Sequence, residues 1–243
     1  MRCAWKHSIA DVHANNYGNV VQDYFSLVIE PSLLALRRRS DELMAITDDE
    51  FFAKAFQIGD HLALMQKTAM AFCLGIQSLW EQQIRTYMAS CTRQFFAPDV
   101  GEDLLFKAIE EEVDKIQKVG WGGDFNKSFM KARGLDFSKF QSYDSLGLLM
   151  LLGNVCRHGE GSAARTLREK HTYLWPAPQP LLEEVFGIRP VADIQLPLEL
   201  LRSLVHAVVL FWRDLERHGL QTFMPNEEAE ARLANHIRNW FDL

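Results

Sequence analysis

Apolar residues recur every three or four positions between residues 62 and 91, and this spacing predicts one long amphipathic helix. The repeat slides by one position near its middle. Its members are Leu62, Met65, Ala69, Phe72, Ile76 and Leu79, and then Trp80, Ile84, Tyr87 and Cys91. Upstream, Thr47 and Glu50 have the spacing of a capping box that would start the helix, and Gly59 is where we expect a break.

Helical patterns of the same kind cover most of the remaining chain. Pro31 should kink or split the first of them, because proline lacks the amide proton and crowds the preceding turn. Gly120 follows an acidic amphipathic helix that begins at Glu102, and it predicts the end of that helix. The expected helices cover residues 20–46, 102–119, part of 124–142, 144–158, 162–170, 198–218 and 226–241.

A proline-rich stretch separates the last two helices from the rest. Five of the eight prolines lie between Pro176 and Pro197, which predicts an extended connection over residues 172–198 with one short strand near Val191 to Gln195. Two helices alone rarely bury enough surface to fold independently. The prediction is therefore a single all-α domain over residues 1–243, a helical bundle with long antiparallel helices. Its core covers roughly residues 59–170, and the proline-rich strap leads to C-terminal helices (198–243) packed on that core.

The composition restricts the class of protein. A chain of 243 residues, 48% hydrophobic and 24% charged, can bury a proper core. The formal net charge of −6 argues against a broad electrostatic grip on nucleic acid and leaves a local basic site open. We find no apolar run of about 20 residues that would span a membrane and no signal segment after the N-terminal charges. We therefore expect a soluble, cytoplasmic protein with no membrane partner.

The cysteines and the known motifs predict neither a metal site nor a cofactor. The four cysteines, at positions 3, 73, 91 and 156, form no C-x-x-C pair, and we expect them to be reduced residues of the core. The sequence has no zinc signature, no phosphate loop and no dinucleotide fingerprint. His61, His206 and His236 fall in helical patterns and are expected at the edge of the core.

The stretch SLGLLMLLGNVCRHGEGSAARTLREK, residues 145–170, places polar groups at the end of an apolar helix. Helix capping explains them in part. Arg157 and His158 occupy the last turn, where cations are stabilised by a few tenths to about 1 kcal/mol each, and Gly159 suits the left-handed position that follows a helix. In this interpretation Asn154 satisfies a carbonyl and Gly153 permits close packing, so all of these residues are structural.

The same residues also fit a site. Asn154 and His158 are four residues apart, which places them on one face of a helix about 6 Å apart along its axis. Polar groups at the end of a central helix are partly shielded from water, and this strengthens their electrostatics. The glycines on either side of Glu160 leave backbone amides accessible to a phosphate or to another backbone segment.

The run LLGNVCRHGEGSAARTLRE resembles the signature of the HEPN superfamily, whose catalytic members carry R-N-x-x-x-H followed by glycine. It is most similar to a bacterial branch with N-x-x-[KR]-H-G-x-G, and LWEQQIRTYM and VLFWRDL also resemble segments of such proteins. The resemblance is strongest over residues 59–170. It implies metal-independent RNA cleavage in a homodimer whose motif helices face each other. His158 would be the acid/base, and Asn154 would orient the phosphate or the histidine.

The chain departs from the family where active members have arginine, because Gly153 stands there and cannot stabilise a charged phosphate. Arg157 is the candidate replacement, although it lies about 100° around the helix from His158. Glu81 is expected either to orient Arg157 or His158 or to pair with Arg85 on its own helix. Two functions remain open: a HEPN-like RNA-binding or RNA-cleaving protein of stress or phage defence, or a catalytically silent dimerisation module. A cognate antitoxin or a nucleotide is a further expected partner.

Overall fold

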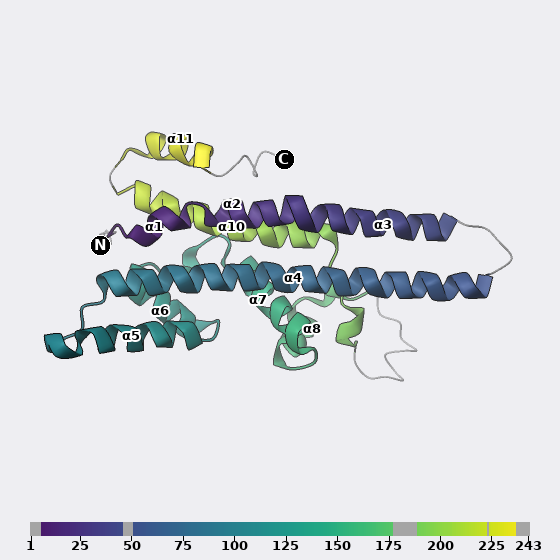
Figure 1. Cartoon of the computed structure of the whole chain (residues 1–243), viewed down its shortest axis with the longest axis horizontal. Coiled ribbons are helices and arrows are strands. Elements are labelled where there is room, and N and C mark those ends of the chain that lie inside the picture. The colour runs from purple at the N-terminus through teal and green to yellow at the C-terminus, as the bar shows by residue number, and fades with distance from the viewer. Residues whose placement is uncertain (1–5, 46–50, 177–188, 223, 237–243) are drawn as a thin grey trace. The chain divides into compact units, whose positions relative to one another are not determined.

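The computed structural model describes residues 6–45, 51–176, 189–222 and 224–236, and the regular secondary structure of these ranges is entirely helical. The predicted all-α helical bundle is therefore confirmed. Within these ranges no helix is long and apolar enough to cross a bilayer. In chain order the elements are α1 (Ile9–Ala14), α2 (Tyr17–Tyr24), the π-helix η1 (Phe25–Ile29), α3 (Glu30–Ala45), α4 (Phe51–Phe95), α5 (Glu102–Lys118), α6 (Gly123–Arg133), the 3-10 helix η2 (Phe137–Lys139), α7 (Tyr143–His158), α8 (Ser162–Lys170), the 3-10 helices η3 (Thr172–Leu174) and η4 (Val191–Asp193), α10 (Leu198–Leu220) and α11 (Asn226–His236) (Figure 1).

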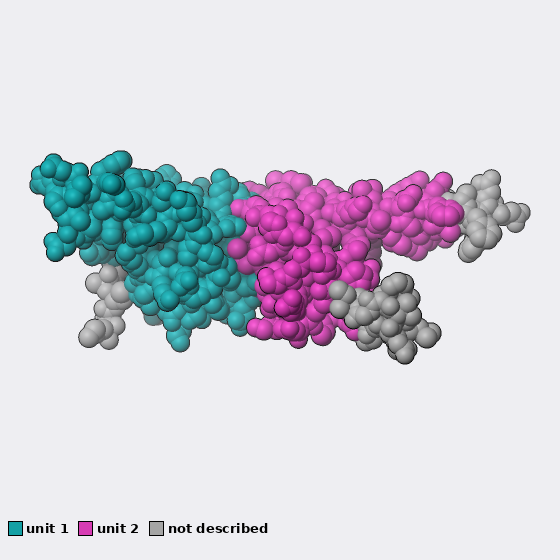
Figure 2. Space-filling view, turned by 90° about the horizontal axis from the view of Figure 1, so that it is seen from below, with its two compact units in different colours: residues 1–22, 79–147, 205–243 teal, residues 23–78, 148–204 magenta. Residues whose placement is uncertain are grey.

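The chain forms two compact units, coloured separately in Figure 2. Unit 1 comprises residues 1–22, 79–147 and 205–243, and unit 2 comprises residues 23–78 and 148–204. The helices α2, α4, α7 and α10 contribute residues to both units. The expectation of a single domain over the whole chain is not decided by this division and stays a prediction.

Aromatic side chains form the centre of unit 1. Trp80 of α4 packs edge-on against Phe211 of α10 with ring centroids 4.8 Å apart, and Phe137 of η2 lies 5.1 Å from Phe211. Such pairs add about 0.5–1.5 kcal/mol to the stabilisation from burial alone. Gln83 is buried at the edge of this cluster, where it donates to the carbonyl of Tyr17 and accepts from Nε1 of Trp212 at 3.1 Å.

In unit 2, α3 and the first part of α4 run antiparallel (Figure 1). His61 of α4 is half-buried and bonds through Nε2 to the carbonyl of Leu36 at 2.8 Å, as expected of a histidine at the edge of the core. The buried apolar residues of this unit come from η1, α3, α4, α7, α8, η3, α10 and the segment between η3 and α10: Phe25, Ile29, Leu43, Ala69, Cys73, Ile76, Leu149, Met150, Leu152, Val155, Ala164, Leu167, Leu174, Trp175, Val191, Ile194, Leu196, Leu201 and Leu204.

The chain stays helical at two positions where an interruption was expected, Gly59 and Pro31. The break expected near Gly59 was wrong, because α4 runs without interruption from Phe51 to Phe95. A glycine inside a helix costs only about 1 kcal/mol, which the packing of so long a helix outweighs. Thr47 and Glu50 lie outside the described residues. Just before Pro31 the chain forms the π-helical turn η1 instead of splitting, and the amide of Glu30 donates to the carbonyl of Phe25.

The strand expected near Val191 to Gln195 was also wrong, because Val191–Asp193 forms the 3-10 helix η4. The segment has one backbone bond to the preceding part of the strap, from the amide of Gln195 to the carbonyl of Leu174 at 2.6 Å. The side-chain amide of Gln66 donates to the carbonyls of Ala192 and Ile194. These carbonyls therefore find their partner in a side chain of α4, so no neighbouring strand is needed. Residues 177–188 of the strap lie outside the described residues.

Candidate functional site

The motif residues Asn154, Arg157 and His158 lie in the last two turns of α7, within unit 2. Gly159 follows with φ of +69°, and its amide donates to the carbonyl of Val155 at 2.8 Å, so the predicted left-handed helix end is confirmed. Arg157 and His158 are exposed, and Asn154, one turn earlier, is half-buried. The end of α7 therefore presents a cation and an imidazole to solvent.

Gly153 is a position of close packing between α7 and α4. It is buried, and a Cβ atom placed on it would lie 2.4 Å from Cγ and 2.7 Å from Cβ of Gln77. Atoms this close to the backbone of α4 cannot be moved aside by rotating the end of a side chain. Gly153, which stands where the resemblance would place an arginine, is thus a packing residue, as the capping interpretation expected, and the Gln77 side chain fills the space beside it.

Gln77 is a functional candidate that the sequence analysis missed. Its side chain is almost fully buried in unit 2, its Oε1 accepts from Nη2 of Arg157 at 3.1 Å, and its Nε2 lies 3.7 Å from the sulfur of Met150. A buried amide that accepts from a guanidinium restricts the rotamers of that arginine. A glutamine within the apolar run from Phe72 to Leu79 was the available signal.

Glu81 pairs with Arg85, which is the alternative that the sequence analysis left open. Its Oε1 accepts from Nε and Nη2 of Arg85 at 3.0 and 2.7 Å. The same guanidinium donates to the carbonyls of Ile116 and Val119 at 2.5 and 2.8 Å. In unit 1, therefore, Glu81 holds an arginine that ties α4 to the C-terminal end of α5.

The acidic residue of the Gly-Glu-Gly sequence is engaged in a structural contact. Both oxygens of Glu160 accept from Nη2 of Arg168 at 2.6 Å, and Oε1 also accepts from the amide of Val191 at 2.9 Å. The hydrogen bond from Arg168 lowers the pKa of this carboxyl group. Arg168 also donates to the carbonyl of Arg189 at 2.7 Å and lies over the ring of Trp175. This loop therefore fixes η4 against the start of α8.

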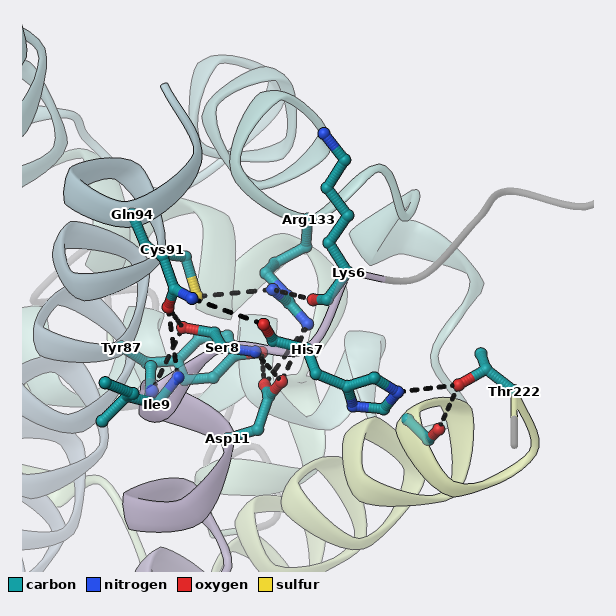
Figure 3. Close-up of polar contacts among 12 residues, drawn as sticks. Lys6, His7, Ser8, Ile9, Asp11, Tyr87, Cys91, Gln94, Arg133 and Thr222 are labelled. Carbon is teal, nitrogen blue, oxygen red and sulfur yellow. Dashed lines mark hydrogen bonds and ion pairs between the residues drawn. The ribbon is translucent and has the colours of Figure 1, made fainter. Parts of the chain in front are cut away.

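Unit 1 contains a buried polar network that the sequence analysis did not identify (Figure 3). Arg133, whose side chain is 1% exposed, donates through Nη2 to both oxygens of Asp11 at 3.3 Å and through Nη1 to the carbonyl of Lys6 and the sulfur of Cys91. Asp11 also accepts from the hydroxyl of Tyr87 at 2.7 Å and closes a capping box with Ser8.

Burial raises the pKa of Tyr87 far above its usual range, and it also raises the pKa of Cys91. Both groups therefore stay protonated at neutral pH. Each oxygen of Asp11 already accepts hydrogen bonds from within the chain, so the network is suited to holding α1, α4 and α6 together. The spacing of Ser8 and Asp11 was the one signal that the sequence offered.

An apolar groove of unit 2 is not lined by the motif residues. It has a volume of about 690 Å³ and lies between α3, the first part of α4 and residues 193–199, with mostly apolar walls. Asn154, Arg157 and His158 are not among its lining residues. In the described part of the chain, no three His, Cys, Asp or Glu side chains come together as a group that could hold a metal ion.

Comparisons of the chain with protein families, with curated proteins and with solved structures found no significant match.

Proposed function

We propose that the chain is a HEPN-like protein that binds RNA at the end of α7 and cleaves it without a metal ion, in stress or phage defence. The observation that carries this proposal is the exposure of Arg157 next to His158 on the last turn of α7, with Asn154 one turn before them. A guanidinium binds phosphate through several donors, and histidine transfers protons near neutral pH. The three residues match the N-x-x-[KR]-H pattern of the bacterial branch in type and spacing. Arg157 would take the role of the arginine that active family members carry at the position of Gly153.

In the proposed reaction His158 takes the proton from a ribose 2′-hydroxyl, and the resulting oxygen attacks the adjacent phosphorus. The P–O5′ bond breaks, the 5′-oxygen leaves as a hydroxyl with the proton returned by the His158 imidazolium, and the other product is a 2′,3′-cyclic phosphate. Arg157 stabilises the negative charge that develops on the phosphate oxygens. Its contact with Gln77 uses one of five N–H donors and positions the group before RNA binds. Asn154 orients the phosphate or the imidazole.

The active form would be a homodimer in which the ends of two α7 helices share one cleft. This arrangement overcomes the angular separation of Arg157 and His158 on one helix, because Arg157 of one copy can act with His158 of the other. A cognate antitoxin or a nucleotide would act by covering this cleft.

The second candidate is a silent helical dimerisation module that uses the same surface to bind a partner or a nucleotide. The tight packing of Gly153 against Gln77 favours it, because the family arginine has no room at this position.

The test is incubation of the purified chain with mixed RNA in excess chelator, with the dimer content measured by light scattering. His13→Ala is the matched control, since His13 is also an exposed histidine in the last turn of a helix. We expect the wild type and His13→Ala to cleave, and His158→Ala to be slower by about 100-fold or more. Arg157→Ala should lose a comparable factor. A dimer that leaves RNA intact would support the silent module, and equal cleavage by His158→Ala would place the chemistry elsewhere.

A further inference from the structure

The crossing of α4 and α7 in unit 2 carries two cysteine thiols in direct contact. Cys73 of α4 is fully buried, Cys156 of α7 is half-buried, and both are free thiols. The two sulfur groups share a hydrogen bond. From the sequence, these cysteines were expected to be reduced residues of the core.

The register of the two helices independently supports this contact. Cys73 lies one turn before Gln77 on the same face of α4, because residues four apart differ by about 40° around a helix. On α7, Cys156 lies about one turn after Gly153 and next to Arg157. Since Gln77 touches both Gly153 and Arg157, the Cys73–Cys156 contact is the next layer of the same helix crossing. The absence of a side chain at Gly153 is what brings the helices this close.

The hydrogen bond shifts the pKa values of the two thiols in opposite directions. It lowers the pKa of Cys156, and together with burial it raises the pKa of Cys73 well above its usual range. Cys156 is also the more exposed of the two, so it is the thiol that an oxidant in solvent reaches first. A thiolate with some access to solvent is the species that peroxides oxidise.

We propose that Cys73 and Cys156 form a redox-sensing pair that closes to a disulfide when the chain meets hydrogen peroxide. The Cys156 thiolate attacks one peroxide oxygen, the O–O bond breaks, and the products are a Cys156 sulfenic acid and hydroxide, which is protonated to water. The Cys73 sulfur then attacks the sulfenic sulfur. The S–S bond forms, the S–O bond breaks, and the hydroxyl leaves as water with the Cys73 proton. Two thiols lose two electrons in total, and the peroxide gains them.

The bond would join α4 to α7 one layer from the contact that positions Arg157. Closure requires the sulfurs to approach to about 2.05 Å, with the geometry of a disulfide at a close helix crossing. Oxidation would thus fix the helix that ends in Asn154, Arg157 and His158. The formation of the bond does not depend on RNA cleavage, so the two proposals can fail separately.

The test is treatment of the folded, reduced chain with hydrogen peroxide, followed by alkylation of remaining thiols and peptide mapping without reductant. We expect a peptide pair linked through Cys73 and Cys156, and its loss in Cys156→Ser and in Cys73→Ala, with circular dichroism confirming that both variants fold. Cys91→Ser should still form it, because Cys91 is buried in unit 1 beside Arg133.

Treatment in denaturant controls for chance pairing, and there the selectivity for this pair should disappear. The proposal is overturned if the folded wild type leaves Cys73 alkylated while Cys156 is oxidised to sulfinic acid. It is also overturned if disulfides form between chains, or if neither cysteine reacts. If the cysteine variants do not fold, the wild-type map alone still decides between these outcomes.

Discussion

Replacing Gly153 with alanine tests the packing of α7 on α4. An added Cβ would lie 2.4, 2.7 and 2.9 Å from Cγ, Cβ and Cδ of Gln77. Overpacking of this kind costs about 1–3 kcal/mol. Alanine also gains roughly 0.5–1 kcal/mol over glycine inside a helix. Gly59→Ala is the matched control, because Gly59 is a helical glycine of the same unit with no atom within 4 Å of the added carbon.

The two variants share the helix-propensity gain, so the difference between their free energies of unfolding isolates the packing cost. We expect urea denaturation to give a difference of about 1–3 kcal/mol, with Gly59→Ala stabilised and Gly153→Ala destabilised. Gln77→Ala should remove only part of the penalty in the double variant with Gly153→Ala, because it removes the clashing Cγ and Cδ atoms and keeps the Cβ atom 2.7 Å from the added carbon. If Gly153→Ala stabilised the chain as much as Gly59→Ala does, the close approach of α4 and α7 would be refuted.

Three further predictions concern the polar networks. Asp11→Ala should lower the free energy of unfolding by about 3 kcal/mol, because it leaves the buried guanidinium of Arg133 without its carboxylate, and a loss below 1 kcal/mol in urea titration would contradict this. Burial raises the pKa of Tyr87 in the folded state, so the unfolded chain ionises first above pH ~10 and stability falls as pH rises further. Tyr87→Phe should make that fall shallower, and an unchanged slope would argue against the burial. Glu160→Gln should speed hydrogen exchange at the amide of Val191 with little change in global stability, because the carboxylate is half-exposed, and unchanged exchange would contradict its role.

The features that local sequence governs were predictable. The ends of α5, α7 and α8 fall within one residue of the predicted bounds, because glycines and caps act within a turn of the residues they terminate. The interruption of a helix was harder to predict. Gly59 and Pro31 weaken a helix locally, but whether the helix breaks depends on its packing along its whole length. The identity of a single residue does not reveal that packing.

The contacts between distant segments could not be predicted. Gln77 and Arg157 are 80 positions apart, and Arg133 and Asp11 are 122 apart. No spacing rule links such pairs, so the sequence identified the chemical groups of the motif without the residue that positions Arg157. The same distance in sequence explains why the strand prediction near Val191 fails: Gln66, which binds the carbonyls of Ala192 and Ile194, lies on α4 far away in the sequence.

The proposed function requires that RNA binds at the end of α7. The direct test of this binding is photo-cross-linking of RNA that contains 4-thiouridine, followed by mass spectrometry of the linked peptides. We expect cross-links on the peptides that contain Asn154 and His158, and we expect these cross-links to be lost when Arg157 is replaced by alanine. Cross-links confined to other helices, or an unchanged map in Arg157→Ala, would contradict it.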